Sequence, residues 1–375
     1  MVYLDYSATT PVNKEVLESY SKCCLNYIGN PNSMHRLGVE AKQLIDASTK
    51  QISELLKVKE EEIIYTSGSS ESNNTVIKGI AHKYQNRGKH IITTLFEHSS
   101  IYGPISFLEK EGFEIDFVKT TDKGMVDLED LEKLIRDDTI LVSVASVNSE
   151  IGLRQPIEEI AKIVKKHPKC FFHSDITQSI GKIDIDLKDV DLMSFSAHKI
   201  YGMKGIGCLI KKENVSIEPL IHGGKSTTIF RSGTPATPLI VSLAKALRLM
   251  LTDLDKKYDH VKELNSYLKE KLAAYPNVYI NSNEDSIPHI LNFSIVGVKP
   301  ETMQHALEEY DIYISTQTAC SSKGDSKGVM ALTGSKERAA SSVRVSLSYL
   351  TTKEECDKFL EAFTKCHTKL TGLVK

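Results

Sequence analysis

The sequence of 375 residues lacks any apolar run that approaches the ~20 residues of a membrane-spanning helix. Its opening, Met1 to Tyr6, carries an acidic side chain and no basic or small-residue signal pattern, so we expect a cytoplasmic protein without membrane contact. An excess of one charge is also missing, because 47 Lys and Arg stand against 49 Asp and Glu. A net charge of -2 predicts no direct binding to nucleic acid and favours a small-molecule substrate.

Cysteines are few and scattered. The seven include no C-x-x-C pair, so neither a disulfide framework nor a zinc site is supported, and no metal is expected. Cys170 and Cys208 lie in apolar, strand-like runs and are predicted to be buried. Cys320 precedes a polar stretch with two glycines, residues 321–328, where a thiolate could reach a substrate and then carry a sulfur atom away.

The chain has no internal repeat, and short β-branched runs alternate with amphipathic helical patterns over its first 200 residues or so. This alternation predicts an α/β fold with a mostly parallel sheet covered by helices on both faces. Ligands then gather at the carboxyl ends of the strands. The predicted strands are 63–66, 90–94, 115–118, 140–145, 170–173, 192–195 and 207–210, and the predicted helices include 72–84, 101–111 and 157–166.

The pattern changes near residue 238 to long charged helices, 239–255 and 257–274, followed by fewer strands and a closing helix, 353–370. We therefore expect a large domain over 13–252 and a smaller α+β domain formed by 1–12 together with 253–375. The later strands are predicted at 290–294, 312–315 and 343–346.

Polar residues follow several predicted strands. A Ser/Gly-rich turn, residues 66–71, leads from a strand into a helix, where a phosphate can be held, although such turns are more often simple helix caps. Asp175 and Gln178 end one apolar run, and Lys199 follows the next strand. An acid for a pyridine nitrogen and a lysine for an aldehyde are the two groups that pyridoxal phosphate requires. The alternative is that both residues begin loops by chance.

Ordered motifs extend over nearly the whole chain, and together they resemble the cysteine desulfurases of the class V aminotransferase-like family, which are pyridoxal phosphate enzymes of fold type I. The opening 3–11 is similar to Y-L-D-x-x-A-T-T-P, and 29–35 is similar to G-N-P-S-S-x-H. The other matching segments are Thr66-Ser67-Gly68, Glu97-His98, the H-x-D-x-x-Q of His173, Asp175 and Gln178, the S-x-H-K of Ser196, His198 and Lys199, Arg231-Ser232-Gly233-Thr234, Ala319-Cys320-Ser321-Ser322 and Ser342-Val343-Arg344.

The resemblance implies a role for each matching residue. Lys199 would hold the cofactor aldehyde and shuttle the Cα proton, and Cys320 would take the substrate sulfur. Arg344 and Ser149 would bind the substrate. The remaining cofactor contacts would be Asp175 at the pyridine nitrogen, His98 on the ring, Gln178 and Ser149 at the phenolic oxygen, Ser69, Ser70, Ser196 and His198 at the phosphate, and Thr234 at the phosphate of a second subunit in a homodimer.

Simpler interpretations remain open at this stage. His35, His173 and Glu97 could only cap or brace loops, and Arg344 could form a surface ion pair. The sequence also departs from the family, because Ser149 stands where an asparagine is usual and the loop 223–228 lacks a Gln-Glu pair.

The resemblance implies conversion of L-cysteine to L-alanine, with a persulfide on Cys320 that passes to a sulfur-acceptor protein. That acceptor would serve iron-sulfur cluster assembly, tRNA thiolation or thio-cofactor synthesis. The alternatives are a selenocysteine lyase or an aminotransferase of the same family, and a non-catalytic sulfur carrier or scaffold, which only the altered Ser149 region favours.

Overall fold

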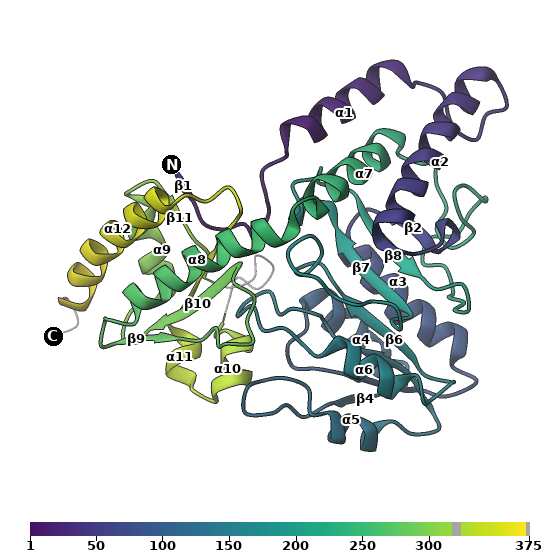
Figure 1. Cartoon of the computed structure of the whole chain (residues 1–375). Coiled ribbons are helices and arrows are strands. Elements are labelled where there is room, and N and C mark those ends of the chain that lie inside the picture. Colours follow the sequence, from purple (N-terminus) through teal and green to yellow (C-terminus); the bar gives the residue numbers. More distant parts are fainter. Residues whose placement is uncertain (317–323, 373–375) are drawn as a thin grey trace.

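A seven-stranded sheet forms the larger part of the protein, whose computed structural model describes residues 1–316 and 324–372 (Figure 1). Neighbouring strands are parallel except where β8 is involved, which confirms the mostly parallel sheet. Each predicted strand of this sheet is present to within two residues at either end. In spatial order the strands are β2 (Ile63–Thr66), β8 (Gly207–Lys211), β7 (Leu192–Ser196), β6 (Phe171–Asp175), β5 (Thr139–Ser143), β3 (His90–Thr93) and β4 (Glu114–Phe117).

The sheet has a hydrophobic core on each face, because side chains alternate along a strand. In β2, Ile63 and Tyr65 pack with one core and Ile64 with the other. Helices α3 (Ser69–Tyr84) and α4 (Ser99–Lys110) cover the Ile64 face, whereas α6 (Ile157–Val164) and α7 (Thr237–Leu251) cover the opposite face. The predicted helical cover on both faces is therefore confirmed. Two short helices complete this part, η1 (Glu60–Glu62) and α5 (Leu128–Leu134).

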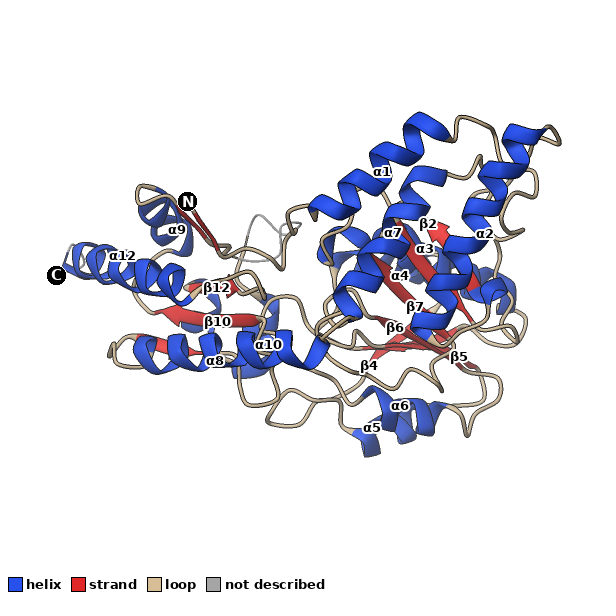
Figure 2. Cartoon of the chain, turned by 45° about the horizontal axis from the view of Figure 1, so that its top comes forward, coloured by secondary structure: helices blue, strands red, loops and turns tan. Residues whose placement is uncertain are grey.

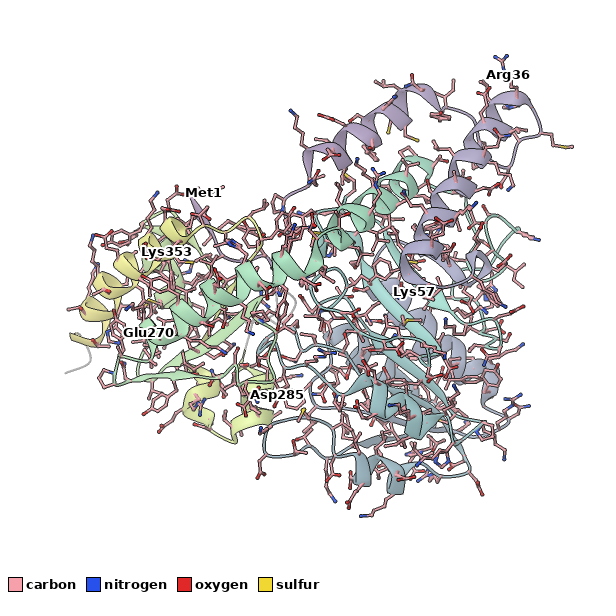
Figure 3. All side chains as sticks on the ribbon, in the orientation of Figure 1. Met1, Arg36, Lys57, Glu270, Asp285 and Lys353 are labelled. Carbon is pink, nitrogen blue, oxygen red and sulfur yellow. The ribbon has the colours of Figure 1, made fainter. Side chains whose placement is uncertain are left out.

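Two helices near the start of the chain were not predicted. Helices α1 (Lys14–Asn26) and α2 (Arg36–Leu56) both pack against α7 and extend away from the sheet (Figures 1 and 2). Arg36, at the start of α2, lies at the opposite end of the molecule from Met1 (Figure 3). Only Val16 and Cys23 of α1 are buried, so this helix carries little of the apolar periodicity that sequence analysis depends on.

The C-terminal part has its own antiparallel sheet and its own core. The sheet has the order β12 (Ser342–Ser346), β10 (Ile290–Ile295), β9 (Val278–Ile280), and a separate pair joins β1 (Val2–Tyr3) to β11 (Ile312–Tyr313). Val2 and Leu4 pack into this core, whereas Tyr6 packs into the core of the large sheet, so the opening residues connect the two parts. The helices here are α8 (Leu254–Leu272), α9 (Pro300–Glu308), α10 (Lys327–Thr333), α11 (Lys336–Ala340) and α12 (Lys353–Gly372).

None of the helices in the described ranges is long and apolar enough to cross a membrane. Cys170 and Cys208 are buried in the large part, as predicted, and burial raises the pKa of both thiols. The exact boundary between the two parts stays a prediction.

Candidate active site

A cavity of about 520 Å³ opens at the carboxyl ends of β6 and β7, where a mostly parallel sheet is expected to bind its ligand. Two predicted residues are not among those that line it: Thr234 is exposed elsewhere, and Cys320 lies outside the described residues. The predicted residues that do line the cavity are Ser69, Ser70, His98, Ser149, Asp175, Gln178, Ser196, His198, Lys199 and Arg344.

Lys199 ends the short helix η2 (Ala197–Lys199), which follows β7 directly. Its Nζ atom donates hydrogen bonds to the carbonyl oxygens of Ser7 and Ala8, the latter at 2.8 Å. These two carbonyls belong to the opening segment that connects the two parts of the molecule. The opening motif therefore has a structural role at the cavity, because its backbone holds the lysine amine.

Asp175, the last residue of β6, has a buried carboxylate group that accepts two hydrogen bonds. Its Oδ2 accepts from Asn73 Nδ2 at 2.7 Å, and its Oδ1 accepts from the backbone N–H of Thr177 at 2.9 Å. These bonds hold the Asp175 side chain in place at the cavity, where it can face a ring nitrogen.

A chain of hydrogen bonds links Asp175 to His98. Asn73 Nδ2 also donates to Ser100 Oγ at 2.9 Å, and that hydroxyl lies 2.8 Å from His98 Nδ1. His98 caps α4 by accepting the backbone N–H of Ser100 at Nδ1. Burial lowers the pKa of His98, so the neutral imidazole is favoured, which suits stacking on an aromatic ring.

The N-terminus of α3 forms a cradle of small donors. Ser69 donates its backbone N–H to Ser196 Oγ at 2.7 Å, and Ser196 Oγ donates to Ser69 Oγ at 2.9 Å. Gly68, just before this helix, touches β8 so closely that a Cβ atom on Gly207 would lie 2.5 Å from its Cα. Hydroxyl groups and the positive N-terminal end of a helix can bind a phosphate, and the small side chains here leave room for one.

His198 lines the same cavity, with Nδ1 at 3.2 Å from Thr9 Oγ1. Burial, followed by the nearby positive charge of Lys199, lowers the pKa of His198 to about 4. A neutral imidazole can still donate one hydrogen bond to a phosphate oxygen.

Arg344 lies in β12 and is 1% exposed, so the interpretation as a surface ion pair is wrong. Its Nη1 donates to the carbonyl of Ser149 at 2.8 Å, and its Nη2 pairs with Asp5 Oδ1 at 2.9 Å. Its Nε is buried and has no hydrogen-bond partner within residues 1–316 and 324–372. A buried guanidinium with a spare donor, lining a cavity, suits an incoming carboxylate.

Glu97, His173 and His35 have bracing contacts, as the simpler interpretation allowed. Glu97 accepts from Thr94 Oγ1 and from the backbone N–H of Ala145, which ties the ends of β3 and β5 together, and burial raises its pKa to about 8. His173 bonds to serines of the two neighbouring strands, and His35 caps α2.

The ends of the segment that carries Cys320 are attached beside the cavity. Ser315 exchanges two backbone hydrogen bonds with Arg344, at 2.7 and 3.1 Å. At the other end, Glu150 accepts from Ser326 Oγ and from the backbone N–H of Gly328. Both Arg344 and Ser149, the neighbour of Glu150, line the cavity.

Three features of the site were missed by sequence analysis. They are the carbonyls of Ser7 and Ala8, the amide of Asn73, and the buried amine of Lys182, whose Nζ donates to Gln178 Oε1 at 2.7 Å. For Asn73 a signal existed, because it follows Ser69 by one helical turn and therefore shares its face of α3.

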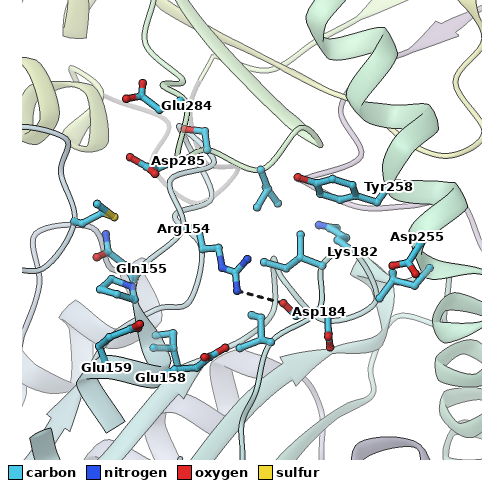
Figure 4. Close-up of a pocket in the computed structure, with 18 residues that line it drawn as sticks. Arg154, Gln155, Glu158, Glu159, Lys182, Asp184, Asp255, Tyr258, Glu284 and Asp285 are labelled. Atoms are coloured by element: carbon cyan, nitrogen blue, oxygen red, sulfur yellow. Dashed lines mark hydrogen bonds between the residues drawn. The ribbon is translucent and has the colours of Figure 1, made fainter. Parts of the chain in front are cut away.

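A second cavity, of about 550 Å³, lies between α6, the start of α8 and the loop before β10 (Figure 4). Arg154 donates to the carbonyl of Asp184 across it, and most of its charged side chains are acidic. Lys182 connects the two cavities, because it lines the second one and donates a hydrogen bond to Gln178, which lines the first.

The chain is similar to known proteins over almost its full length. The family model described as aminotransferase class-V matches residues 2–359. A NifS/IcsS protein homolog from Lactobacillus delbrueckii subsp. bulgaricus is 42% identical over 374 residues, covering 98% of this chain and 97% of that protein. The cysteine desulfurase IscS of Dictyoglomus turgidum is 39% identical over 375 residues, covering 98% and 95%.

Solved structures are also similar to this chain over almost its full length. A structure named as a NifS-like protein superimposes with a TM-score of 0.92 at 36% identity and covers 99% of both chains. Another, described as SspA in complex with cysteine, has a TM-score of 0.82 at 32% identity and covers 94% of this chain and 100% of its own.

Proposed function

The chain belongs to the class V aminotransferase family, and on this basis we propose that it is a cysteine desulfurase, which converts L-cysteine to L-alanine and transfers the sulfur to Cys320. One observation carries the proposal: an amine, a buried carboxylate and a buried guanidinium with a spare donor, those of Lys199, Asp175 and Arg344, line one cavity. The names of the relatives favour this activity over a selenocysteine lyase, an aminotransferase or a silent scaffold.

Enzymes of this family depend on pyridoxal phosphate, and the donor set of the cavity fits that group. Lys199 would hold its aldehyde, Asp175 its pyridine nitrogen and His98 its ring face. Its phenolic oxygen would be bound by Gln178 and Ser149, and its phosphate by Ser69, Ser70, Ser196 and His198. When bound, pyridoxal phosphate supplies an electron sink that stabilises negative charge on the substrate Cα.

The protein's own residues would perform the remaining steps. Arg344 binds the carboxylate of L-cysteine through its buried guanidinium. Lys199 Nζ takes the proton from Cα and later returns a proton to the product, as a general base and acid. The thiolate of Cys320 attacks the substrate sulfur, so that an S–S bond forms while the Cβ–S bond breaks. The electron pair of the broken bond stays on the carbon side, where protonation gives alanine.

We further infer a homodimer in which Thr234 contributes to the phosphate site of the partner subunit. Thr234 is exposed and does not line the cavity of its own chain. Large apolar side chains are exposed on the neighbouring surface, including Met34, which is 97% exposed, and Ile28 and Ile229. The loops that carry them meet where Asn32 Nδ2 approaches Ser226 Oγ at 3.4 Å. Burial of these side chains between subunits would remove them from water.

The persulfide on Cys320 would pass to a sulfur-acceptor protein in the cytoplasm. The attachment of Ser315 and Ser326, on either side of Cys320 in the sequence, beside the cavity supports this role. The acceptor belongs to iron-sulfur cluster assembly, tRNA thiolation or thio-cofactor synthesis.

Borohydride treatment of the purified yellow protein is expected to fix pyridoxal phosphate covalently on Lys199. Lys204 lines the same cavity and provides an internal comparison, because it is exposed to the reagent but does not follow β7 directly. Peptide mass spectrometry locates the label. A label on Lys204, or a protein that binds no pyridoxal phosphate, would refute the assignment of the cofactor site.

The substitution Ser149→Asn is expected to raise turnover of L-cysteine modestly, by about fivefold or less. The Ser149 carbonyl is held by Arg344 at 2.8 Å, so a longer amide side chain at this position would project into the same cavity and add a direct hydrogen bond there. One such bond contributes on the order of 1 kcal/mol.

Steady-state kinetics of alanine formation measure the effect of Ser149→Asn. Ser149→Ala is the matched control, since it removes the hydroxyl without adding an amide and should not raise turnover. A sharp loss of activity in Ser149→Asn would contradict this view of the pocket.

A further inference from the structure

Lys182 is a lysine almost without contact with water. It follows β6 by seven residues and is 6% exposed. Burial, with the nearby positive charges of Lys199 and Arg344, lowers the pKa of Lys182 to about 7. A buried cation costs free energy unless it is well paired, yet Lys182 Nζ has one hydrogen-bond acceptor within residues 1–316 and 324–372.

That acceptor is the side chain of Gln178. Lys182 Nζ donates to Gln178 Oε1 at 2.7 Å, and it forms no ion pair with a carboxylate of residues 1–316 or 324–372. The charged and titratable groups whose charges interact with Lys182 are Lys199, Arg344, His198 and His289. Burial keeps both histidines neutral, because it lowers the pKa of His198 to about 4 and that of His289 to about 3. The burial of Lys182 is therefore not explained by an ion pair that joins two elements of the fold.

The bond decides which way the Gln178 amide points. The oxygen and the NH₂ group of a glutamine have almost the same shape, so their partners determine the orientation. Lys182 Nζ donates this bond, and the carbonyl of Ser7 on the other side of the amide can only accept, so the amide oxygen faces Lys182. The NH₂ group then faces the opposite side, where Nε2 donates to the carbonyl of Ser7 at 3.0 Å, the same carbonyl that accepts from Lys199. Its second hydrogen remains for the cavity that Gln178 lines.

We propose that Lys182 is a positioning residue, which holds the Gln178 amide so that only its NH₂ group faces the bound cofactor. This inference rests on the proposed function, in which Gln178 contacts the phenolic oxygen of pyridoxal phosphate. A donor fixed in this way stabilises negative charge on that oxygen. Lys182 also forms part of the wall of the second cavity, so it reaches Gln178 from behind the active site (Figure 4).

The test is a double-mutant cycle on the protein loaded with pyridoxal phosphate. Its variants are Lys182→Met, Gln178→Leu and the two combined. The readout is the pH at the midpoint of the change in the visible absorbance band. We expect Lys182→Met to raise this midpoint by about half to one pH unit, which corresponds to the loss of one hydrogen bond to the phenolic oxygen. In the Gln178→Leu background the same substitution should shift the midpoint by less than half as much.

Each other outcome contradicts the inference. Equal shifts in both backgrounds would mean that Lys182 acts through its charge and not through Gln178. An unchanged midpoint with a lowered melting temperature would reveal a purely structural role. Lys182→Leu repeats the measurement if the methionine variant does not fold. A parent protein without a visible band would overturn the proposed function and this inference together, whereas a normal band with an unmoved midpoint overturns this inference alone.

Discussion

Replacement of Cys320 by alanine is expected to abolish sulfur release from L-cysteine while the protein keeps its yellow colour and still binds the substrate. The residues that hold the cofactor and the substrate carboxylate, among them Asp175, Lys199 and Arg344, line the cavity independently of the Cys320 side chain. Cys320 is needed only as the nucleophile that accepts sulfur. Binding and desulfuration should therefore separate in this variant.

Sulfide release in the presence of a reductant and the absorbance change on addition of L-cysteine measure the two properties. Cys24→Ala is the matched control, because Cys24 is the exposed cysteine of the described chain and should be dispensable. If Cys320→Ala and the parent released sulfide at the same rate, Cys320 would not be the sulfur acceptor.

Replacement of Lys199 by alanine is expected to reduce alanine formation by at least about 10²- to 10⁴-fold, the range for loss of a positioned general acid or base. The loss should exceed that of any other single substitution around the cavity except Cys320, because Lys199 both holds the cofactor and moves the Cα proton. Folding should survive, because Lys199 lines a cavity and its replacement leaves the hydrophobic cores of both parts unchanged.

Lys204→Ala serves as the control for Lys199→Ala, because both lysines line the same cavity. Single-turnover formation of alanine from L-cysteine is the measurement. An inactive Lys204→Ala combined with an active Lys199→Ala would reverse the assignment of the two lysines.

The strand ends and the residues placed on them could be predicted from the sequence. Asp175 and Lys199 follow strands whose apolar runs are unambiguous, and parallel strands bring their carboxyl ends to one edge of a sheet. Ser69 and Ser70 follow in the same way from the strand-to-helix turn after β2. For this reason most predicted site residues line one cavity.

The supporting contacts could not be predicted, for identifiable physical reasons. The carbonyls of Ser7 and Ala8 that hold Lys199 are backbone atoms, and a sequence gives no sign of which carbonyl faces a site. The sequence around Lys182 does not distinguish it from a surface lysine. Its burial depends on the tertiary fold, which brings it close to Arg344 of β12 and to His289, just before β10. Helix α1 was missed because most of its side chains are exposed.

The most direct test of the central claim is the amount of alanine and persulfide formed when the protein, loaded with pyridoxal phosphate, receives L-cysteine without a reductant. We predict about one alanine for each subunit, matched by one additional sulfur atom on the peptide that contains Cys320, and continuous turnover once a reductant is added. The account would be contradicted by a protein that forms no alanine, or that forms alanine while the Cys320 peptide gains no sulfur.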